Sequence, residues 1–461
     1  MRIHGNSRAI STVVVMASLL GGLAGHAALA APVQNLPPPS QMPPPIGPAN
    51  TCSPPSGAGT NHGSVNGPET WTAAGNPHFV NFDISIYAQL TLQPCAVVRI
   101  APGRTITINP AGALIAAGQP GFPVTIEAKV PGMPWATIRN MGGGLWLNHA
   151  IVISGGASLG GPLVVNAALR MASPPPANTG MLHVDDVMVA ASSSQGIYIE
   201  NNVGFDPSSQ NLRIVGSASF PLNIPARVVG SVPSGDYTKN RRWAIAIAGG
   251  QIFDAQTLHN RGLAYHIGTG APGANLDVRS GVANGGVATL TIEPGVRILF
   301  PPAGSLTIDA TIGNSAAQGA LIAIGTPEQP IVLTSDRGPA SAPGDWIGVV
   351  LGNAIDQQSV MRYVQVFYAG GPRTGGSNSC PNPTSPGNND AAIGINGPPQ
   401  KQFIFDTEIL YSARHGIDRG WRADDQPDFL RSNSFKDIAG CLQTTPRDFS
   451  GGCPVNVPCP K

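Results

Sequence analysis

The chain has 461 residues, of which 11% are charged, and its formal net charge is +1. Ordinary globular domains contain about 25% charged residues, so partner recognition dominated by charge is not expected. The only cluster of cations, Lys239-Asn240-Arg241-Arg242, is too short for the basic surface of a nucleic-acid-binding protein. Nucleic acid is therefore not an expected partner.

The N-terminus has the pattern of a secretory signal peptide. Arg2 and Arg8 precede an apolar run from Ile10 to Ala24, and Ala28-Leu29-Ala30 offers the small residues at which signal peptidase cuts. The run is shorter than the roughly 18 residues of a membrane-spanning helix, and a retained anchor is the alternative. We predict a signal peptide over residues 1–30 and a mature protein without a membrane span. Its expected location is extracellular or at the cell surface, with the periplasm as the other destination.

Residues 31–76 contain Pro-Pro-Pro twice, at 37–39 and 43–45, among Ser, Asn and Gly. Such a composition buries too little apolar surface to offset the entropy lost on ordering. This segment is predicted to be a disordered tether.

From about Phe79 onward, the chain consists mainly of short β-prone runs bounded by Gly, Pro or Asn. Thr105-Ile106-Thr107-Ile108 shows the alternation of a strand, and amphipathic helical patterns are nearly absent after the signal. Few Asn-Gly or Asp-Gly hairpin turns occur, and no regular propeller period is found. A fold of β-sandwich domains is not excluded. These features favour an all-β fold, specifically a right-handed parallel β-helix.

One ordered passage occurs twice, over residues 90–156 and 290–371. Both copies contain Gly-Ala-Leu-Ile-Ala, at 112–116 and 319–323, and place Trp135 and Trp346 at corresponding points. The shared positions are mostly apolar residues, Gly, Pro and Trp, which are the residues that stacked coils need. We therefore predict two β-helix segments, over 77–230 and 231–440, followed by a Cys-rich cap over 441–461.

The second copy carries three phrases, Leu290-Thr291-Ile292-Glu293-Pro294-Gly295-Val296, Gly325-Thr326-Pro327-Glu328-Gln329-Pro330-Ile331-Val332 and Pro343-Gly344-Asp345-Trp346-Ile347-Gly348. In these it resembles right-handed parallel β-helix proteins of the pectin-lyase-like superfamily, in a subset of secreted bacterial proteins. The first copy departs from the pattern, with Gln93 and Cys95 at the positions of Glu293 and Gly295. The resemblance implies the fold; members include polysaccharide lyases and hydrolases, and also proteins with no assigned catalysis.

An even number of cysteines in an exported protein predicts disulfides. No Cys-x-x-Cys or paired His spacing supports zinc, so neither a metal nor a cofactor is expected. The 15 pairings of six cysteines stay open, and the simplest partition joins the first two and pairs the other four among themselves. The cysteines are Cys52, Cys95, Cys380, Cys441, Cys453 and Cys459.

The densest group of chemically versatile side chains lies near residues 414–421. His415 could transfer a proton, Asp418 could orient it, and Arg419 could hold a carboxylate. Candidate binding residues are Arg414, Trp421 and Tyr368. The alternative is a polar coil edge in which Trp421 covers the end of the core. The pair Asp185-Asp186 is a weaker candidate, because adjacent strand residues point to opposite faces.

The sequence thus predicts a secreted structural or binding module whose partner is an extracellular polysaccharide or a surface protein. A polysaccharide lyase or glycoside hydrolase acting on an outer groove is the alternative.

Overall fold

The structure is a computed structural model that describes residues 50–158, 166–172, 181–200, 203–269, 272–280, 286–308, 318–352, 354–373, 390–421, 426–446 and 459. The predicted signal peptide and most of the predicted tether lie outside these residues, as do Cys380 and Cys453. The rest of the predicted tether, residues 50–76, contains two strands and a short 3₁₀ helix of the first coil.

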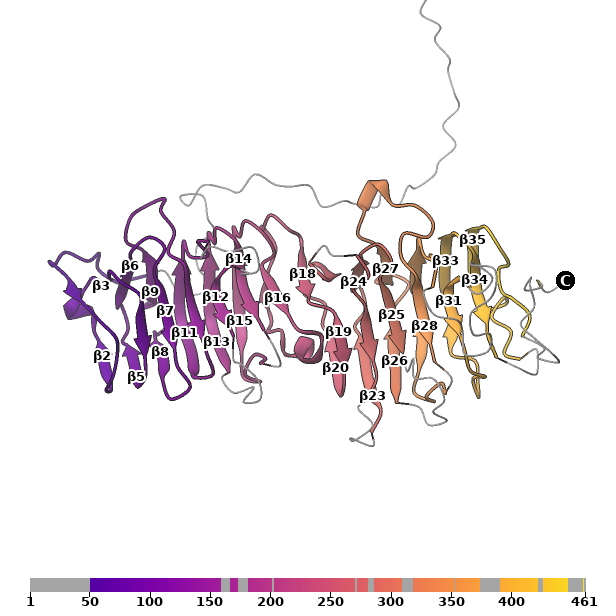
Figure 1. The fold of residues 1–461 in the computed structure, drawn as a ribbon, viewed down its shortest axis with the longest axis horizontal. Helices are drawn as coiled ribbons and strands as arrows, with labels where there is room; N and C mark the ends of the chain where they lie inside the picture. Colours follow the sequence, from indigo (N-terminus) through magenta and orange to yellow (C-terminus); the bar gives the residue numbers. More distant parts are fainter. Residues whose placement is uncertain are drawn as a thin grey trace, which may run out of the picture.

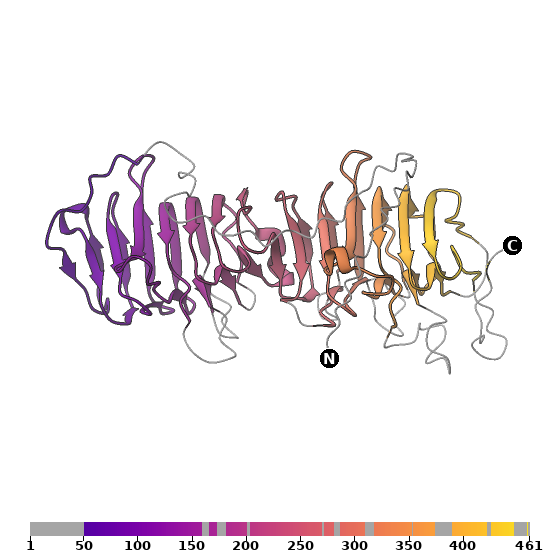
Figure 2. The same ribbon diagram turned by 90° about the horizontal axis from the view of Figure 1, so that it is seen from above.

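The described residues form a parallel β-solenoid, so the predicted all-β parallel β-helix is confirmed. Every pair of neighbouring strands runs parallel, and the coils follow one another along a single long axis in both views (Figures 1 and 2). The strands belong to four sheets, of 13, 11, 6 and 5 strands.

The 13-stranded sheet consists of β4 (Ile84–Ile86), β7 (Thr105–Ile108), β10 (Thr137–Asn140), β12 (Ala167–Met171), β14 (Gln195–Ile199), β16 (Leu222–Ile224), β18 (Ala244–Ile247), β21 (Ala264–Ile267), β24 (Arg297–Phe300), β27 (Ile331–Ser335), β30 (Val364–Phe367), β33 (Thr407–Ser412) and β35 (Asn433–Ile438). It runs from β4 to β35 without a break. One solenoid therefore contains both copies of the repeated passage.

The 11-stranded sheet accompanies the first half of the solenoid. It consists of β1 (Thr60–Asn61), β2 (Glu69–Trp71), β3 (His78–Val80), β5 (Gln89–Leu92), β6 (Val97–Ile100), β8 (Ala113–Ala117), β9 (Val124–Ala128), β11 (Gly144–Ile153), β13 (Leu182–Ala190), β15 (Gln210–Val215) and β17 (Gly235–Asp236).

The two smaller sheets accompany the second half. The 6-stranded sheet consists of β19 (Gly250–Ile252), β22 (Leu276–Val278), β25 (Ser305–Ile308), β28 (Gly348–Leu351), β31 (Ala391–Ile395) and β34 (His415–Arg419), and the 5-stranded sheet of β20 (Ala255–Leu258), β23 (Ala288–Ile292), β26 (Gly319–Ile324), β29 (Val360–Arg362) and β32 (Ile404–Phe405). The short 3₁₀ helices are η2 (Ala73–Gly75), η3 (Ala226–Ser231) and η4 (Gly338–Ala340).

The core follows from the alternation along each strand. In β7, Ile106 and Ile108 are buried, while Thr105 and Thr107 point outward. Ile106 pairs with Ile84 on one side and with Ile138 on the other, so like residues stack from coil to coil. The result is a continuous apolar interior along the solenoid.

The two copies of the repeated passage form similar coils. Corresponding strands of the two copies, however, lie on neighbouring faces of the solenoid and not on the same face. The strands β5, β6 and β7 of the first copy correspond to β23, β24 and β25 of the second. The 13-stranded sheet contains β7 from the first copy and β24 from the second. Between the two copies, the 11-stranded sheet ends at β17, and the 6-stranded and 5-stranded sheets begin at β19 and β20.

Trp135 and Trp346 fill the same place in the two copies, as expected from their spacing. Both side chains are fully buried, and each indole Nε1 donates to a backbone carbonyl, of Ile153 at 2.9 Å and of Phe367 at 2.7 Å respectively. Trp346 also stacks on Phe300 with ring centroids 4.3 Å apart. The two tryptophans are therefore part of the core.

Both ends of the described solenoid carry a disulfide. Cys52–Cys95 joins the N-terminal segment to the first coils, and Cys441–Cys459 lies at the C-terminal end. The expected pairing of the first two cysteines is confirmed. None of the helices in the described ranges is long and apolar enough to span a membrane.

Removal of the Cys52–Cys95 bridge is expected to weaken the N-terminal coils. The bridge spans 43 residues, and in the chain-entropy account a loop of this size contributes about 4 kcal/mol. We expect the paired Cys52→Ser and Cys95→Ser variant to lower the free energy of unfolding by about 2–4 kcal/mol, measured by denaturant titration. The Cys441–Cys459 bridge spans only 18 residues. The paired Cys441→Ser and Cys459→Ser variant therefore serves as a comparison, with a smaller expected loss in the free energy of unfolding. An unchanged denaturation midpoint after removal of the first bridge would contradict the expectation.

Candidate functional site

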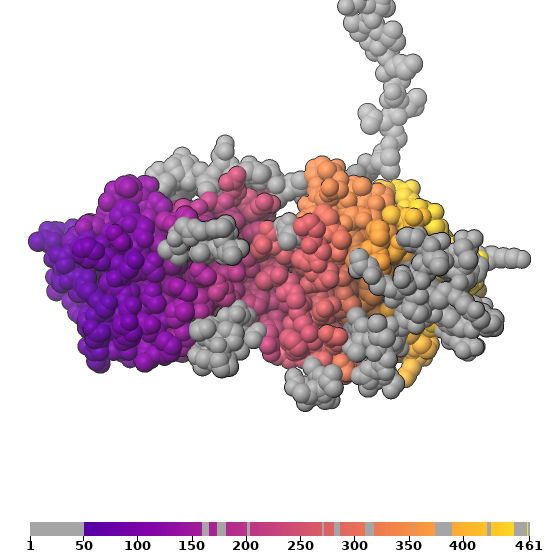
Figure 3. Space-filling model, in the orientation of Figure 1, coloured from indigo at the N-terminus to yellow at the C-terminus, as the bar shows by residue number. Residues whose placement is uncertain are grey.

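A groove of about 570 Å³ lies on the outer face of the 13-stranded sheet, at the middle of the solenoid. In Figure 3 the orange coils near residue 340 stand out along the upper edge of the molecule. The residues lining the groove are Ala218, Ser219, Phe220, Arg241, Arg242, Trp243, Ala244, His266, Thr269, Leu299, Asp336, Arg337 and Gly338.

The groove lies at the shortest step between neighbouring strands of the 13-stranded sheet. Ile245 of β18 pairs with Tyr265 of β21, only 20 residues later, whereas Val366 and Ile409 of later coils are 43 residues apart. A short coil has little chain left for outward loops, so the longer loops before and after it form the walls. The floor of the groove consists of small side chains, since Ala244, Ala246 and Ala264 pack with Phe220 on the outer face of the sheet.

Two arginines give the groove its positive charge. Arg241 and Arg242 are exposed, and within the described residues neither makes an ion pair or a side-chain hydrogen bond. The Arg242 guanidinium lies 5.7 Å from the centre of the Phe220 ring, which limits its orientations. Arg337 on the opposite wall is neutralised, because its Nη1 lies 3.1 Å from Asp345. Arg241 and Arg242 therefore remain available to an anionic ligand.

The remaining charged pair of the groove is engaged internally. His266 is buried, its Nδ1 lies 2.9 Å from the Gly268 carbonyl oxygen, and its Nε2 lies 3.3 Å from the Asp336 carboxylate. Both ring nitrogens therefore face oxygen atoms of the protein. This contact joins the two walls of the groove.

Trp243 supplies an apolar surface beside the arginines. Its side chain is 39% exposed, and within the described ranges it has no ring contact with another aromatic side chain. An exposed indole next to two cations is suited to a ligand that combines an apolar face with negative charge.

The sequence-predicted catalytic residues lie elsewhere, at the C-terminal end. Asp418 and Arg419 of β34 are 0% and 2% exposed. Arg419 Nε donates to the Thr444 carbonyl at 2.6 Å, and Thr444 Oγ1 donates to Asp418 at 3.3 Å. Trp421 is buried beside Phe429 with its ring edge-on. These three side chains close the end of the core.

The other predicted residues keep some exposed surface but do not meet the groove. His415 Nδ1 accepts from the Cys441 backbone N–H at 3.0 Å, and Arg414 is exposed next to it. Tyr368 stacks on Tyr411, with ring centroids 5.2 Å apart and an interplanar angle of 9°. The structure thus brings His415 and Arg414 together with the buried cap, and it leaves all six predicted residues outside the groove.

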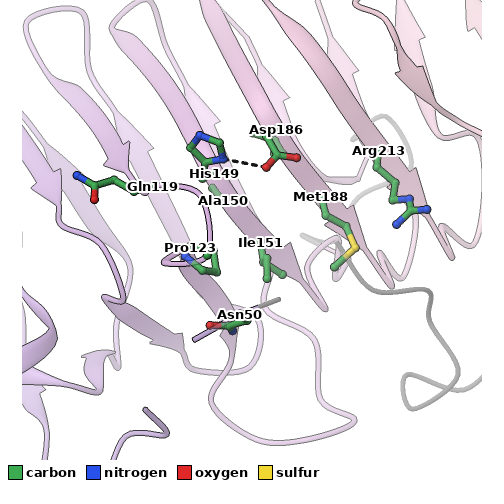
Figure 4. A pocket seen from close by; sticks show the side chains of 11 residues that line it. Asn50, Gln119, Pro123, His149, Ala150, Ile151, Asp186, Met188 and Arg213 are labelled. Atoms are coloured by element: carbon green, nitrogen blue, oxygen red, sulfur yellow. Dashed lines mark hydrogen bonds and ion pairs between the residues drawn. The ribbon is translucent and has the colours of Figure 1, made fainter. Parts of the chain in front are cut away.

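A second, much smaller pocket contains a His–Asp pair (Figure 4). His149 Nδ1 lies 2.8 Å from Asp186 Oδ2, and both residues occupy left-handed bends, with φ of 43° and 52°. These bends turn Asp186 away from the strand alternation that its neighbour Asp185 follows. The accessible space is about 30 Å³, the size of one water molecule. The pocket is too small for a sugar.

A Ser–His–Asp group occurs on the outer face of β13 but lacks the geometry of a catalytic triad. Both Ser208 Oγ, at 3.2 Å, and Asp206 Oδ1, at 3.5 Å, approach the same nitrogen of His183, Nδ1. The other nitrogen, Nε2, lies 3.0 Å from Asn148 Oδ1. A relay needs the serine and the carboxylate on different nitrogens. The hydrogen bond from Ser208 lowers the pKa of Asp206, so this group is a fixed polar cluster.

Comparisons with known proteins give no assignment: no family model, no curated protein and no solved structure matches the chain. No group of three or more potential metal ligands is found in the part of the chain that the structure describes.

The residues of the groove were not predicted as a site. Their signal was the run Arg241-Arg242 followed by Trp243, which sequence analysis weighed only against nucleic-acid binding. The other walls come from residues 218–220 and 336–338, which are distant in the sequence.

Proposed function

We propose that this protein is a secreted β-helix that binds an anionic polysaccharide in the groove of its 13-stranded sheet. The observation that carries the proposal is an exposed tryptophan beside two arginines that have no acidic partner among the described residues, in a hollow of about 570 Å³. Pockets that hold small ligands usually measure about 300–1,000 Å³. The hollow is large enough for a short stretch of a polysaccharide.

The chemistry of the groove supports a charged sugar over a neutral one. A sugar ring presents C–H groups on its face, which can lie on the indole of Trp243. Carboxylate or sulfate groups accept charge-assisted hydrogen bonds, and arginine donates two parallel ones to such groups. An anion next to Arg241 and Arg242 would balance their charge, which Arg337 on the opposite wall does not need because it is already paired with Asp345.

Binding without turnover is the better supported form of this function. Glycoside hydrolysis needs two carboxyl groups on either side of the bond, and the described lining of the groove contains one, that of Asp336, which contacts His266. Both nitrogens of His266 are engaged within the protein, with the Gly268 carbonyl oxygen and the Asp336 carboxylate. A lyase or hydrolase stays the alternative activity, and kinship with the pectin-lyase-like superfamily is part of the same proposal.

Export is proposed on the N-terminal sequence pattern and on the two disulfides. Cys52–Cys95 and Cys441–Cys459 persist most readily in an oxidising compartment. The ligand would then be encountered outside the cytoplasm, as an extracellular or cell-surface polysaccharide.

The test is binding and turnover of purified mature protein with acidic polysaccharides, polygalacturonate and alginate, and with neutral dextran. We expect saturable binding of an acidic polymer that weakens as salt rises, no binding of dextran, and no release of unsaturated products or reducing ends. Equal binding of dextran, or no binding of any acidic polymer, would overturn the proposal. Turnover that is lost on His415→Ala would instead establish the enzymatic alternative.

A further inference from the structure

A pair of hydrogen-bonded histidines joins the N-terminal segment to the first coil. His62 follows β1 and His78 begins β3, and His62 Nε2 lies 2.9 Å from His78 Nδ1. The His62 ring stacks on Trp71 at 3.8 Å between centroids, and His78 lies 5.2 Å from the same indole. The three rings form a small cluster at the end of the solenoid.

The hydrogen-bond roles in this cluster are fixed by a carbonyl. His78 Nε2 lies 2.8 Å from the Thr72 carbonyl oxygen, which can only accept, so His78 carries its proton on Nε2. His78 Nδ1 must then accept, and His62 Nε2 donates to it. A second proton on His78 would place two N–H groups head to head at 2.9 Å. The closed pair therefore takes up at most one added proton, on His62 Nδ1.

Other hydrogen bonds also hold this segment. Thr60 N donates to the Pro77 carbonyl at 2.9 Å, His62 N to the Phe79 carbonyl at 3.0 Å, and Val65 N to the Ser85 carbonyl at 2.9 Å, while Tyr87 N donates to the Val65 carbonyl at 2.8 Å. Ser85 N also donates to Ser64 Oγ at 3.0 Å, and Asn81 Nδ2 donates to Asn61 Oδ1 at 2.6 Å. The strand β1 has only two residues and lies at the edge of its sheet. Short strands at the edge of a sheet are among the parts of a fold that open most easily.

We propose that His62 and His78 form an acid-sensitive latch, whose protonation separates β1 from β3 and opens the segment between the Cys52–Cys95 disulfide and β2. The charged group acting on the pair is Glu69 of β2, which also accepts a hydrogen bond from Trp71 Nε1 at 3.0 Å. Glu69 favours a single added proton on His62. It does not remove the repulsion between the two N–H groups that a second proton on His78 would bring together. Opening leaves the edge of β3 without its partner strand and uncovers Trp71. The latch is independent of the function proposed for the groove.

The pH range follows from the direction of the pKa shifts. Burial lowers the pKa of both histidines, and for His62 the neighbouring His78 lowers it further while Glu69 acts in the opposite direction. In the open segment both residues have the ordinary value of about 6.5. The open form therefore takes up protons that the closed form refuses. The closed form keeps its full stability above about pH 6.5 and loses it as the pH falls below that value.

The experiment is hydrogen exchange of the full mature protein at pH 7.5 and pH 5.0, corrected for the intrinsic exchange rate. We expect the opening equilibrium of peptides that contain Thr60, His62 and Val65 to rise about tenfold per proton taken up and per pH unit below 6.5. Peptides from β24 should not change. Equal protection of residues 60–65 at the two pH values would overturn the proposal.

Two variants separate the latch from a general effect of acid. His62→Gln keeps a donor for His78 but cannot titrate, so its pH response should be smaller than that of the wild type. His259→Gln removes a histidine that pairs with Glu293 in another coil, so the wild-type response of residues 60–65 should persist. The same pH response in His62→Gln as in the wild type would overturn the latch. If His62→Gln does not fold, the exchange of the wild-type protein decides alone.

Discussion

Replacing Arg241 and Arg242 together with Gln is expected to weaken binding of acidic polysaccharide about 100-fold. Each charge-assisted hydrogen bond contributes roughly 1.5–3 kcal/mol, which corresponds to about tenfold or more in the dissociation constant. The fold should not suffer, because both side chains are exposed and have no acidic partner among the described residues. The measurement is a titration at several salt concentrations, in which the variant should also show a flatter salt dependence.

A control of equal charge distinguishes the groove from a general electrostatic effect. Arg104 and Arg227 lie outside the groove, and Arg227 lies 4.6 Å from the Phe253 ring, much as Arg242 lies on Phe220. The variant with Arg104→Gln and Arg227→Gln has the same net charge as the groove variant. We expect it to bind within about twofold of the wild type, since removing distant surface charges changes little. An equal loss of affinity in both double variants would show that net charge, not the groove, attracts the polymer.

The fold was predictable because it repeats. Each coil places apolar residues at alternate positions, as Ile106 and Ile108 do in β7, so the same signal occurs many times along the sequence. The equivalence of Trp135 and Trp346 was also visible, since a residue that plugs the core must recur with the coil. The sequence did not predict that corresponding strands of the two copies lie on neighbouring faces of the solenoid. This arrangement depends on which sheet each strand joins, and that is known only from the strand pairing.

The candidate site was not predictable for two physical reasons. The groove forms because the coil at β18 has too few residues for outward loops. The length of that coil, 20 residues, can be measured only after the strand register is known. Burial also decides whether a cluster of polar residues can contact a ligand or serves the core. Asp418 and Arg419 form a promising sequence pattern, but both side chains point into covered space and bond with Thr444. A sequence gives the types of side chains but not their exposure.

Trp346→Ala is expected to lower the free energy of unfolding by about 3–5 kcal/mol, the largest effect on stability that we predict. The indole is fully buried, stacks on Phe300, and donates from Nε1 to the Phe367 carbonyl. Truncation leaves a cavity that neighbouring coils cannot fill without shifting, and it removes the hydrogen bond to that carbonyl. Denaturant titration followed by circular dichroism measures the loss, and a change below 1 kcal/mol would contradict the role of Trp346 in the core.

Trp243→Ala is the matched control, because the same substitution is made where the side chain is 39% exposed. We expect its stability to stay within about 0.5 kcal/mol of the wild type, as for other surface positions. Its affinity for acidic polysaccharide should fall about tenfold, since the ligand loses the apolar surface beside Arg241 and Arg242. The two variants therefore separate the two uses of tryptophan in this chain. If Trp243→Ala lost stability without losing affinity, Trp243 would belong to the scaffold, and the ligand would have to be held by the arginines alone.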